Sequence, residues 1–470
     1  MAMKKNWYLI IIALIFLLVL CYFGTKRVIS INIWDKWEIT TNFFNIENTI
    51  DLFDTTKVHE IKILMPDNEY KNMTDTYINT SEKDWYKANI IIDGVTIYDV
   101  GIRLKWEYSL KQLLLENWIK KSNSEQYKYE SQLPLLIKFD KYIDQIYQKH
   151  EMISLRVGLM WSDPTLLPET YSYKLYKTLW QPAPDTSYWA VQINGKDTKL
   201  FLISELPEDK YFIEKWFWDD NWIMYKAWNF VNFIYLWDDP TLYSNAFKQK
   251  TMINNYDLAP LIKMLKFITE SDNEEFEKNI DNYIDIKSVI TLLAIDTFVW
   301  NNDSFGGMWS NYYLYYNLWK QKFYILTWDQ NLALWTAWWN LWWFSMHQEL
   351  QSNKPITPKF TWWNAINGKW LMWNNGFNIL KIRLLTNETY RTMFYDTYEN
   401  VETIALDTDF SDKLFEEWSN TFLNYNKKNQ LIPEIAYKQW IGRLKNYLEN
   451  MLRYRTQKNL NNRKTTLINN

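Results

Sequence analysis

The side chains of this protein best suited to chemistry are its carboxylates, because other common catalytic side chains are scarce. Its 470 residues include one cysteine, Cys21, and three histidines, His59, His150 and His347. A disulfide, a cysteine-rich zinc site and a catalytic thiol in the body of the chain are therefore excluded. His150 precedes a glutamate, as in a zinc-protease helix, but Ser154 stands where the second histidine ligand belongs. We expect acid–base or metal chemistry to depend on aspartate and glutamate.

Two aspartates and an asparagine have the arrangement of a phosphoryl-transfer site. Asp303 follows a predicted helix and enters a loop, whereas Asp329 follows a predicted strand, from which its carboxylate can project into a cleft. One acidic residue that orients a hydroxyl, with a downstream Asp and an Asn that hold Mg²⁺, is the minimum set for kinase-type transfer. An aspartate in a loop is more often a cap or turn residue, so the spacing alone leaves both interpretations open.

A mixed set of strands and helices must position these residues. Apolar runs, several of them alternating, predict strands at 58–63, 88–92, 96–105, 134–139, 188–193, 200–204, 312–316 and 323–326. Helix-start signals and apolar patterning predict helices at 163–179, 207–217, 256–270, 285–300 and from about 375 to the end. The predicted fold class is α+β, with one large body at 58–455 that ends in a helical part, and a basic, polar tail at 456–470.

An N-terminal membrane anchor is predicted at residues 1–27, followed by a spacer at 28–57. The apolar run from Trp7 to Phe23 would reach about 26 Å as a helix, just enough to span a bilayer core. No small-x-small cleavage site follows it, and Leu20 is too large for a lipoprotein signal, which is the minor alternative. Charges flank both ends equally. Because single N-terminal anchors usually insert with the N-terminus inside, we expect a single-pass membrane protein with an extracytoplasmic domain.

The overall composition excludes some partners and some nucleotide sites. Lys and Arg number 52 against 55 for Asp and Glu, a net charge of −3, so no nucleic-acid partner is expected. No Gly-x-Gly-x-x-Gly or Gly-Lys-Ser/Thr loop is present, so a standard kinase or P-loop nucleotide site is unsupported.

Several motifs, in order along residues 58–450, together resemble the CotH family of atypical kinases, which is named after a spore-coat protein. The Asp303 and Asp329 segments, with Asn311-Tyr312-Tyr313-Leu314-Tyr315 between them, are similar to the family's "NWDS…NYYLY…PWD" core. The other matching segments are Val100 to Lys105 ("VGxRLKG"), Leu155-Arg156 to Asp163-Pro164-Thr165 ("LRN…DPS"), Pro182-Ala183-Pro184 ("PAP"), Ile193-Asn194-Gly195 to Glu205 ("ING…GLYLLVE"), Met224-Tyr225-Lys226 ("LYK") and Asn378 to Tyr390 ("PLLxRLLxNPEF"). Asn302 and Gln330 depart from the family pattern.

The resemblance implies an atypical protein-kinase-like fold that binds ATP with Mg²⁺ or Mn²⁺. Asp303 matches the catalytic aspartate, Asp329 matches the metal-binding aspartate, and Asn311 is the expected second metal ligand. The residues implied on the nucleotide side are Arg103, Lys105, Lys138, Arg156, Glu205 and Lys226. For Lys138 and Glu205 the alternatives are an edge-strand lysine and a hairpin carboxylate, and Arg156 could instead pack under the helix predicted from Asp163.

Three functions follow from these observations. The first is a membrane-anchored kinase that transfers the γ-phosphate of ATP to Ser or Thr of a surface or coat protein. The second is a catalytically inactive surface protein of the same fold, that is, a pseudokinase or an adhesion module. The third is a tryptophan-rich module that binds carbohydrate or membrane. Retention of Asp303, Asn311 and Asp329 favours the first function over the second.

Glycine is unusually rare and tryptophan unusually common in this chain. It has 10 glycines, about 2%, where roughly 7% is usual, and 29 tryptophans. Some tryptophans lie in pairs among turn-forming residues, as Trp338 and Trp339 do. Others, namely Trp106, Trp180, Trp218 and Trp222, lie in segments where the CotH family has glycine. We therefore hypothesise that the gene uses an alternative genetic code, in which UGA codons translated here as tryptophan specify glycine. An aromatic binding surface is the other interpretation.

Overall fold

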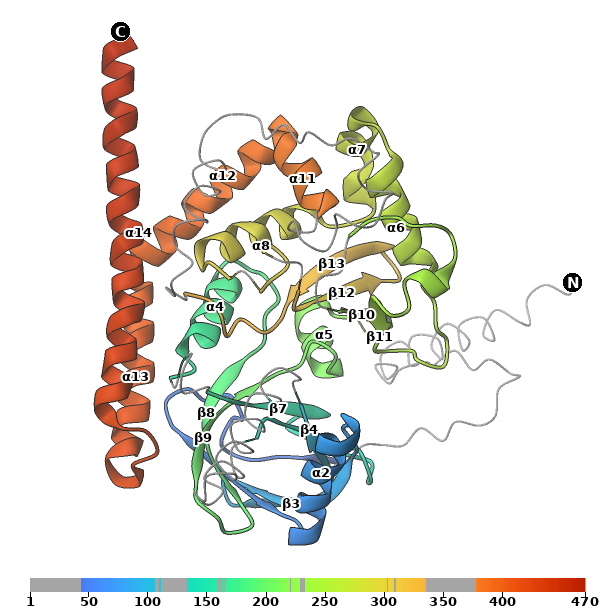
Figure 1. The fold of residues 1–470 in the computed structure, drawn as a ribbon, viewed down its shortest axis with the longest axis vertical. Coiled ribbons are helices and arrows are strands. Elements are labelled where there is room, and N and C mark those ends of the chain that lie inside the picture. The colour runs from blue at the N-terminus through green and yellow to red at the C-terminus, as the bar shows by residue number, and fades with distance from the viewer. Residues whose placement is uncertain are drawn as a thin grey trace, which may run out of the picture. The chain divides into compact units, whose positions relative to one another are not determined.

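Figure 1 shows the fold of the chain in a computed structural model. The structure describes residues 44–105, 110, 133–158, 163, 165–219, 221–228, 233–301, 303–307, 310–334 and 378–469. The described residues belong to one compact unit, Phe43–Asn470.

A closed β-barrel forms the N-terminal half of this unit. Its strands follow the order β2-β3-β4-β5-β7-β9-β8. Their bounds are β2 (His59–Leu64), β3 (Tyr86–Ile92), β4 (Val95–Leu104), β5 (Leu135–Lys138), β7 (Met152–Val157), β8 (Thr186–Ile193) and β9 (Lys199–Ser204). Neighbouring strands are antiparallel except β2 and β8, whose parallel pairing aligns Ile61 with Val191 and closes the barrel.

The barrel wall has an inner and an outer face, because successive side chains of a strand point to opposite sides of the sheet. The two faces contact different apolar clusters. Leu135 and Ile137 of β5 are buried in the barrel interior. Leu136, between them, belongs instead to a second apolar cluster that includes Trp328. Arg103 of β4 lies opposite Leu136 in the strand register, so its side chain is on the same outer face. This outer face of β4 and β5 carries side chains toward the rest of the unit.

Smaller elements complete the N-terminal half. The helix α2 (Asp67–Thr80) packs on β3 and β4 through Tyr70, Met73 and Tyr77, whose spacing places them on one helix face. A parallel strand pair joins β1 (Phe44–Ile46) to β6 (Gln145–Tyr147). Because β1 is paired and Leu52 is 2% exposed, part of the segment predicted as a spacer belongs to the folded unit.

A second, antiparallel sheet and its helices form the other half, drawn above the barrel in Figure 1. The sheet has the order β11-β10-β12-β13. Its strands are β10 (Trp222–Ala227), β11 (Phe247–Gln249), β12 (Tyr312–Asn317) and β13 (Lys322–Thr327), and the helices are α4 (Leu167–Thr178), α5 (Lys210–Phe217), α6 (Ala259–Glu270), α7 (Asn273–Asn279) and α8 (Ile286–Phe298), with short 3₁₀ turns η1 (Pro240–Leu242) and η2 (Ile280–Asn282). Nearly every residue of α8 is buried, so this helix is the centre of the largest apolar cluster.

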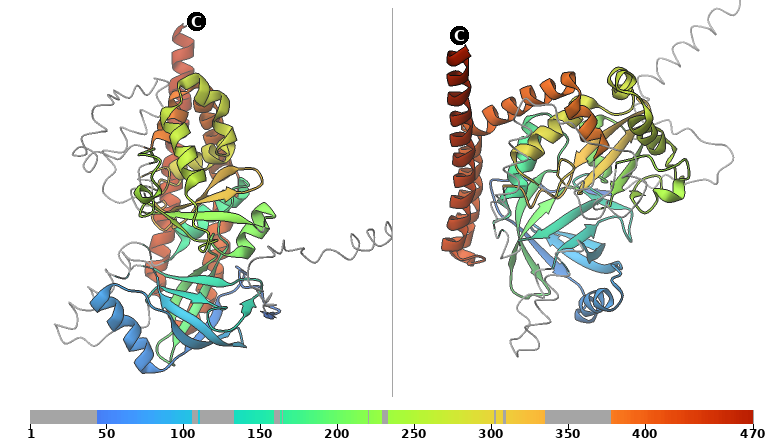
Figure 2. Two further views of the ribbon diagram at one scale, coloured as in Figure 1. Left: turned by 90° about the vertical axis from the view of Figure 1, so that its right-hand side faces the viewer. Right: turned by 45° about the horizontal axis from the view of Figure 1, so that its top comes forward.

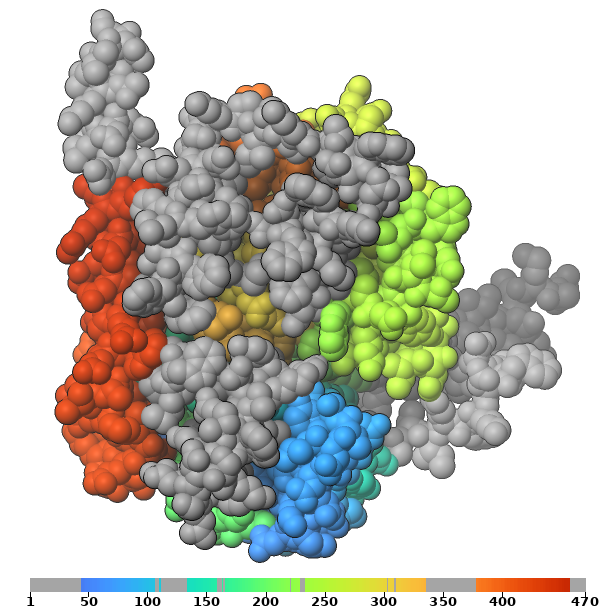
Figure 3. All heavy atoms as spheres, viewed as in Figure 1, coloured from blue at the N-terminus to red at the C-terminus, as the bar shows by residue number. Residues whose placement is uncertain are grey.

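The C-terminal helices cover this half and reach the barrel. They are α11 (Ile379–Thr386), α12 (Glu388–Glu402), the π-helical turn η3 (Thr403–Asp407), α13 (Phe410–Asn429) and α14 (Glu434–Asn469). The helix α12 packs on α8, and α13 packs on α4 and α14. The last two helices run side by side in Figures 1 and 2 and form one edge of the face shown in Figure 3. Tyr425 of α13 donates a hydrogen bond of 3.1 Å to Glu60 of β2.

The mixed α+β class predicted from the sequence is confirmed, but several helix starts were predicted three or four residues too early, among them that of α6, which begins at Ala259 and not at 256. The helix predicted from Asp163 begins at Leu167, because Asp163 forms a turn by accepting the Thr165 N–H at 2.8 Å and Leu166 has left-handed backbone (φ 58°). The helix predicted from residue 207 begins at Lys210, because Asp209 caps it. The strands β1, β6, β7, β10 and β11 and the helices α2 and α7 were not predicted. Among the described residues no helix is long and apolar enough to cross a membrane, and the predicted anchor, residues 7–23, lies outside them.

Candidate active site

Asp303, Asn311 and Asp329, which are far apart in the sequence, lie together in the structure. Asp303 follows α8 in the loop that leads to β12, and Asp329 follows β13. The amide nitrogen Nδ2 of Asn311 donates to the Asp303 carboxylate at 2.9 Å and to its backbone carbonyl at 2.8 Å. Burial, together with the nearby negative charge of Asp329, raises the pKa of Asp303 to about 6. The two carboxylates therefore share one electrostatic environment.

Asp329 is held by a buried ion-pair network that includes Arg156 of β7. One guanidinium nitrogen of Arg156 pairs with Asp329 Oδ1, and the other donates to Glu169 of α4 at 2.8 Å. Tyr173, one helical turn after Glu169, donates to Glu169 at 3.0 Å and accepts the backbone N–H of Asp329 at 2.9 Å. Burial raises the pKa of Glu169 to about 7, while Arg156 acts in the opposite direction. The backbone of Asp329 is left-handed (φ 57°), so these contacts hold an unusual conformation.

Asp296 of α8 forms hydrogen bonds with both of the loops that carry the site aspartates. Its buried carboxylate accepts the backbone N–H of Gly306 at 2.9 Å, the hydroxyl of Tyr176 at 2.6 Å and the amide of Gln330 at 3.3 Å. Gln330, next to Asp329, in turn accepts from Asn301 at 2.9 Å. A Cβ atom at Gly306 would lie 2.7 Å from the Asp296 Cβ, so glycine is required there by close packing. Burial raises the pKa of Asp296.

A group of basic side chains surrounds Glu208, and one of them, Lys226, feels the charge of Asp329. Lys250 pairs with Glu208 at 3.6 Å. The positive charges of Lys250, Lys105, Lys226 and Arg103 outweigh the effect of burial and lower the pKa of Glu208. These cations come from three places in the chain: Arg103 and Lys105 at the end of β4, Lys226 in β10 and Lys250 after β11. We call these four cations with Glu208 the basic cluster.

The basic cluster adjoins the aspartates. Burial lowers the pKa of Lys226 to about 8, the charge of Lys250 adds to this effect, and the charge of Asp329 opposes it. The pKa of Lys105 is held well below its usual range by burial and by the charge of Lys226. The Lys105 amine lies 4.7 Å from the ring centroid of Trp328, the residue before Asp329. Trp328 is fully buried against Tyr313, with ring centroids 5.9 Å apart. Cationic and anionic side chains therefore meet at the end of β13.

Two residues predicted on the nucleotide side, Lys138 and Glu205, form ion pairs outside the site. Lys138 of β5 pairs with Asp140 at 3.0 Å. Glu205, after β9, pairs with Lys215 of α5 at 2.6 Å and accepts the backbone N–H of Asp185 at 2.8 Å. The structure therefore brings Arg103, Lys105, Arg156 and Lys226 to the site, and it places Lys138 and Glu205 in ion pairs that do not include the site aspartates.

Five site residues were not recognised in the sequence: Glu169, Tyr173, Glu208, Lys250 and Asp296. Glu169 and Tyr173 are four residues apart on α4, a spacing that places both on one helix face and was open to detection. Glu208 and Lys250 carried no comparable signal, because their partners come from other strands.

The side chains present fit a magnesium-type ion. Hard divalent cations prefer carboxylate and amide oxygens and retain several waters or phosphate oxygens. Asp329 supplies a carboxylate, and the Nδ2 donation from Asn311 to Asp303 leaves the Asn311 amide oxygen available for such a role. Within the described ranges no group of three or more His, Cys, Asp or Glu could hold a metal by itself. Phosphate oxygens or water would have to complete the ligand set.

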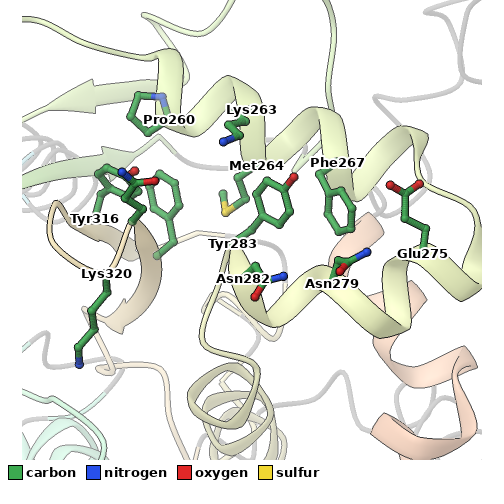
Figure 4. Close-up of a pocket in the computed structure, with 12 residues that line it drawn as sticks. Pro260, Lys263, Met264, Phe267, Glu275, Asn279, Asn282, Tyr283, Tyr316 and Lys320 are labelled. Carbon is green, nitrogen blue, oxygen red and sulfur yellow. The ribbon is translucent and has the colours of Figure 1, made fainter.

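A separate cavity of about 450 Å³ lies near α6, away from these residues (Figure 4). It is lined by α6, the α7–η2 segment and the β12–β13 hairpin, with Lys263, Tyr283 and Lys320 among its side chains. None of the predicted site residues lines it.

Comparison with known proteins identifies the family. The family model described as CotH kinase protein matches residues 121–457, which is most of the chain. This protein therefore belongs to the CotH family, as its motifs indicated, and is a CotH-type kinase-like protein. No curated protein matches the chain.

Proposed function

We propose that this protein is an ATP-dependent protein kinase, which transfers the γ-phosphoryl group to a Ser or Thr hydroxyl of a surface or coat protein. The observation that carries the proposal is the meeting of Asp303, Asn311 and Asp329 with the basic cluster at the end of β13. Phosphoryl transfer depends on positioning and on stabilising charge, and this arrangement offers both.

In this proposal Asp303 acts on the substrate hydroxyl. Its carboxylate, oriented by the Asn311 amide, accepts the hydroxyl proton while the hydroxyl oxygen bonds to the γ-phosphorus. The bond from that phosphorus to the β,γ-bridging oxygen breaks, and ADP leaves. With a pKa of about 6, Asp303 is ionised at neutral pH and is a stronger base than an ordinary aspartate.

The remaining side chains bind and orient the phosphates. Lys105, Lys226 and Arg103 supply positive charge to the phosphate oxygens. Asp329 and Asn311 would hold Mg²⁺ or Mn²⁺, which neutralises phosphate charge when bound. Arg156 and Tyr173 keep the Asp329 side chain and backbone in place.

The test uses the full chain with γ-labelled ATP and Mg²⁺ or Mn²⁺. Asp329→Ala is expected to abolish metal-dependent ATP binding, whereas Asp303→Asn should retain binding and lose transfer. Asp197→Asn, which changes an 88% exposed carboxylate, is the matched control and should behave as wild type. Transfer that persists in Asp303→Asn would contradict the assigned base.

One contact favours a second function, a catalytically inactive CotH protein. Arg156 already neutralises Asp329, so the expected metal ligand has a cationic partner of its own. In a pseudokinase this ion pair would be permanent, and neither Mg²⁺ nor Mn²⁺ would promote ATP binding to the wild-type chain. Metal-dependent ATP binding by calorimetry therefore separates the two functions.

We also propose that residues 7–23 anchor the protein in a membrane with the domain outside the cell. Support comes from the apolar run of the sequence. The full-length protein should stay in membranes through a carbonate wash, and deletion of residues 1–27 should release it. Recovery of the full chain in the soluble fraction would refute the anchor.

A further inference from the structure

Three helices of this protein end in a tryptophan with left-handed backbone. Among the described helices, five end at a residue with left-handed backbone, whatever its type: Ser81, Trp180 (φ 59°), Trp218 (φ 53°), Trp300 (φ 52°) and Gln430. Glycine is the usual residue at this position, because it adopts the left-handed conformation without a Cβ clash. None of the five is glycine.

The hydrogen bonds around two of these residues are those of a glycine-type helix end. After α4, the N–H of Trp180 donates to Lys177 at 3.0 Å and the N–H of Gln181 donates to Tyr176 at 2.9 Å. This pair of bonds defines the Schellman motif, whose left-handed residue is most often glycine. After α5, the N–H of Trp218 donates to Glu214 at 3.1 Å, which is the simpler left-handed cap.

The third helix end leads into the candidate active site. After α8, the N–H of Asn301 donates to the Asp296 carbonyl at 3.2 Å, which is the longer bond of the Schellman motif. Trp300 therefore occupies the left-handed position of that motif. The chain then enters the loop that carries Asp303. The backbone conformation at position 300 therefore sets where this loop begins.

At two of these helix ends the tryptophan side chain is hardly buried, so it gains little stabilisation from packing. Trp180 is 86% exposed and Trp218 is 93% exposed. By contrast, Trp189 and Trp328 are fully buried, and Trp189 stacks on His59 with ring centroids 4.6 Å apart. Trp189 and Trp328 thus pack in the core, whereas Trp180 and Trp218 are exposed to solvent at backbone positions that suit glycine.

We propose that residues 180, 218 and 300 are glycine in the natural protein, because the gene carries UGA codons there that its translation system reads as glycine. Tryptophan normally has the single codon UGG, and UGA is read as tryptophan in some genetic codes. One reassigned codon would therefore exchange this pair of residues and leave all others unchanged. The whole-chain composition, 10 glycines against 29 tryptophans, is the imbalance that such an exchange produces.

An aromatic binding surface does not account for the same observations. Side chains that bind carbohydrate or membrane must be exposed, but nothing about binding requires a left-handed backbone at a helix end. Trp300 is partly buried against the core and could not belong to such a surface. Trp222 lies in β10 and is 7% exposed, so the helix-end argument does not extend to this position.

The first test is the gene with the native protein. The expected result is UGA at codons 180, 218 and 300, UGG at codons 189 and 328, and tryptic peptides of the native protein with glycine at the three UGA positions. UGG at the three positions, or native peptides that contain tryptophan there, would overturn the proposal.

The second test is the stability of the full chain with tryptophan at all 29 positions where the sequence has it. A left-handed residue with a side chain costs enough that glycine at 180 or 218 should raise the folding equilibrium constant about five- to thirtyfold. Trp189→Gly is the control, and it should destabilise the chain because it empties a buried site. Loss of stability in both Trp180→Gly and Trp218→Gly would contradict the proposal. Circular dichroism during urea unfolding gives all three values.

Discussion

Asp303 carries its charge in surroundings that favour the neutral form. Burial and the Asp329 carboxylate raise its pKa to about 6, against the hydrogen bond from Asn311, which favours the ion. If Asp303 accepts the substrate proton, only its ionised form is active. We therefore expect kcat/KM to rise with pH through about 6 and to level off above it. A profile that is flat across this range would show that another group is the base.

Arg156 is the residue whose loss should be most costly, because it pairs with both the buried Glu169 and the partly buried Asp329. Arg156→Met would leave both without their cation, and the expected loss of unfolding free energy is about 3–5 kcal/mol. Adding Glu169→Gln should recover part of this loss, since one buried charge is then removed. Urea unfolding of the two single variants and the double variant measures the coupling. Simple additivity of the two single effects would contradict the network.

At the level of single residues, the site residues that belong to a sequence motif could be predicted. The residues that hold these site residues in place could not. Asp303, Asn311 and Asp329 were recognised because their segments have a characteristic order along the chain. Asp296 and Glu208 were not, because each is defined by partners that only the fold brings close. A buried carboxylate and an exposed one look alike in a sequence.

A close contact between Gly306 and Asp296 constrains the loop between α8 and β12. At Gly306 a Cβ atom would lie 2.7 Å from the Asp296 Cβ and 3.0 Å from its carboxylate. Gly306→Ala should therefore displace the loop that carries Asp303, lowering kcat more than it changes KM for ATP and costing about 1–3 kcal/mol of stability. Gly442→Ala in α14 is the matched control. It has no atom within 4 Å of the added Cβ and should be neutral or stabilise by up to about 1 kcal/mol. Equal kinetics in both variants would contradict this role of Gly306.

The predictability of an element depended on whether its burial left a pattern in the sequence. The strand β2 alternates between buried and exposed residues, and it was predicted nearly to the residue. The strands β8 and β9 are buried on both faces and lack this alternation, and they were predicted from the hairpin turn between them, at Asn194-Gly195. The strands β7 and β10 are buried to the same extent, and they were missed. The helix α2 is mostly polar and buries only Tyr70, Met73 and Tyr77, which made its periodicity weak.

The stability of the whole molecule should depend on Glu151, at the start of β7. Burial raises its pKa to about 7, the charge of Asp209 adds to this effect, and Lys138 opposes it. Since the folded pKa lies above the ordinary value of 4.5, the folded state binds this proton more tightly. Glu151 therefore lowers stability progressively as pH rises from about 4.5 to about 7.

Glu151→Gln removes this titration. The variant should match wild type in acid and become more stable above neutral pH, by a margin on the order of 2–3 kcal/mol. Urea unfolding of both proteins as a function of pH measures the difference. A constant difference between the two proteins at all pH values would contradict the assignment.

At the scale of the molecule, the α+β class and the order of most elements were predictable, but closure of the barrel was not. Two hairpins were recognised, 88–105 and 188–204, because each is a local pairing. The pairing of β2 with β8 joins segments about 130 residues apart, and no local pattern indicates which distant strand a barrel edge will meet.

This pairing has a consequence for how the chain folds during synthesis. β2 is among the first strands to emerge, but its parallel partner follows about 130 residues later, so the barrel stays open at that edge in the meantime. Non-local pairings of this kind form slowly because a long loop must close before any contact is gained. An exposed strand edge is also a template for pairing with other chains. We therefore expect nascent chains that end before β8 to aggregate or to require a chaperone, and chains that extend beyond β9 to become protected from protease at β2.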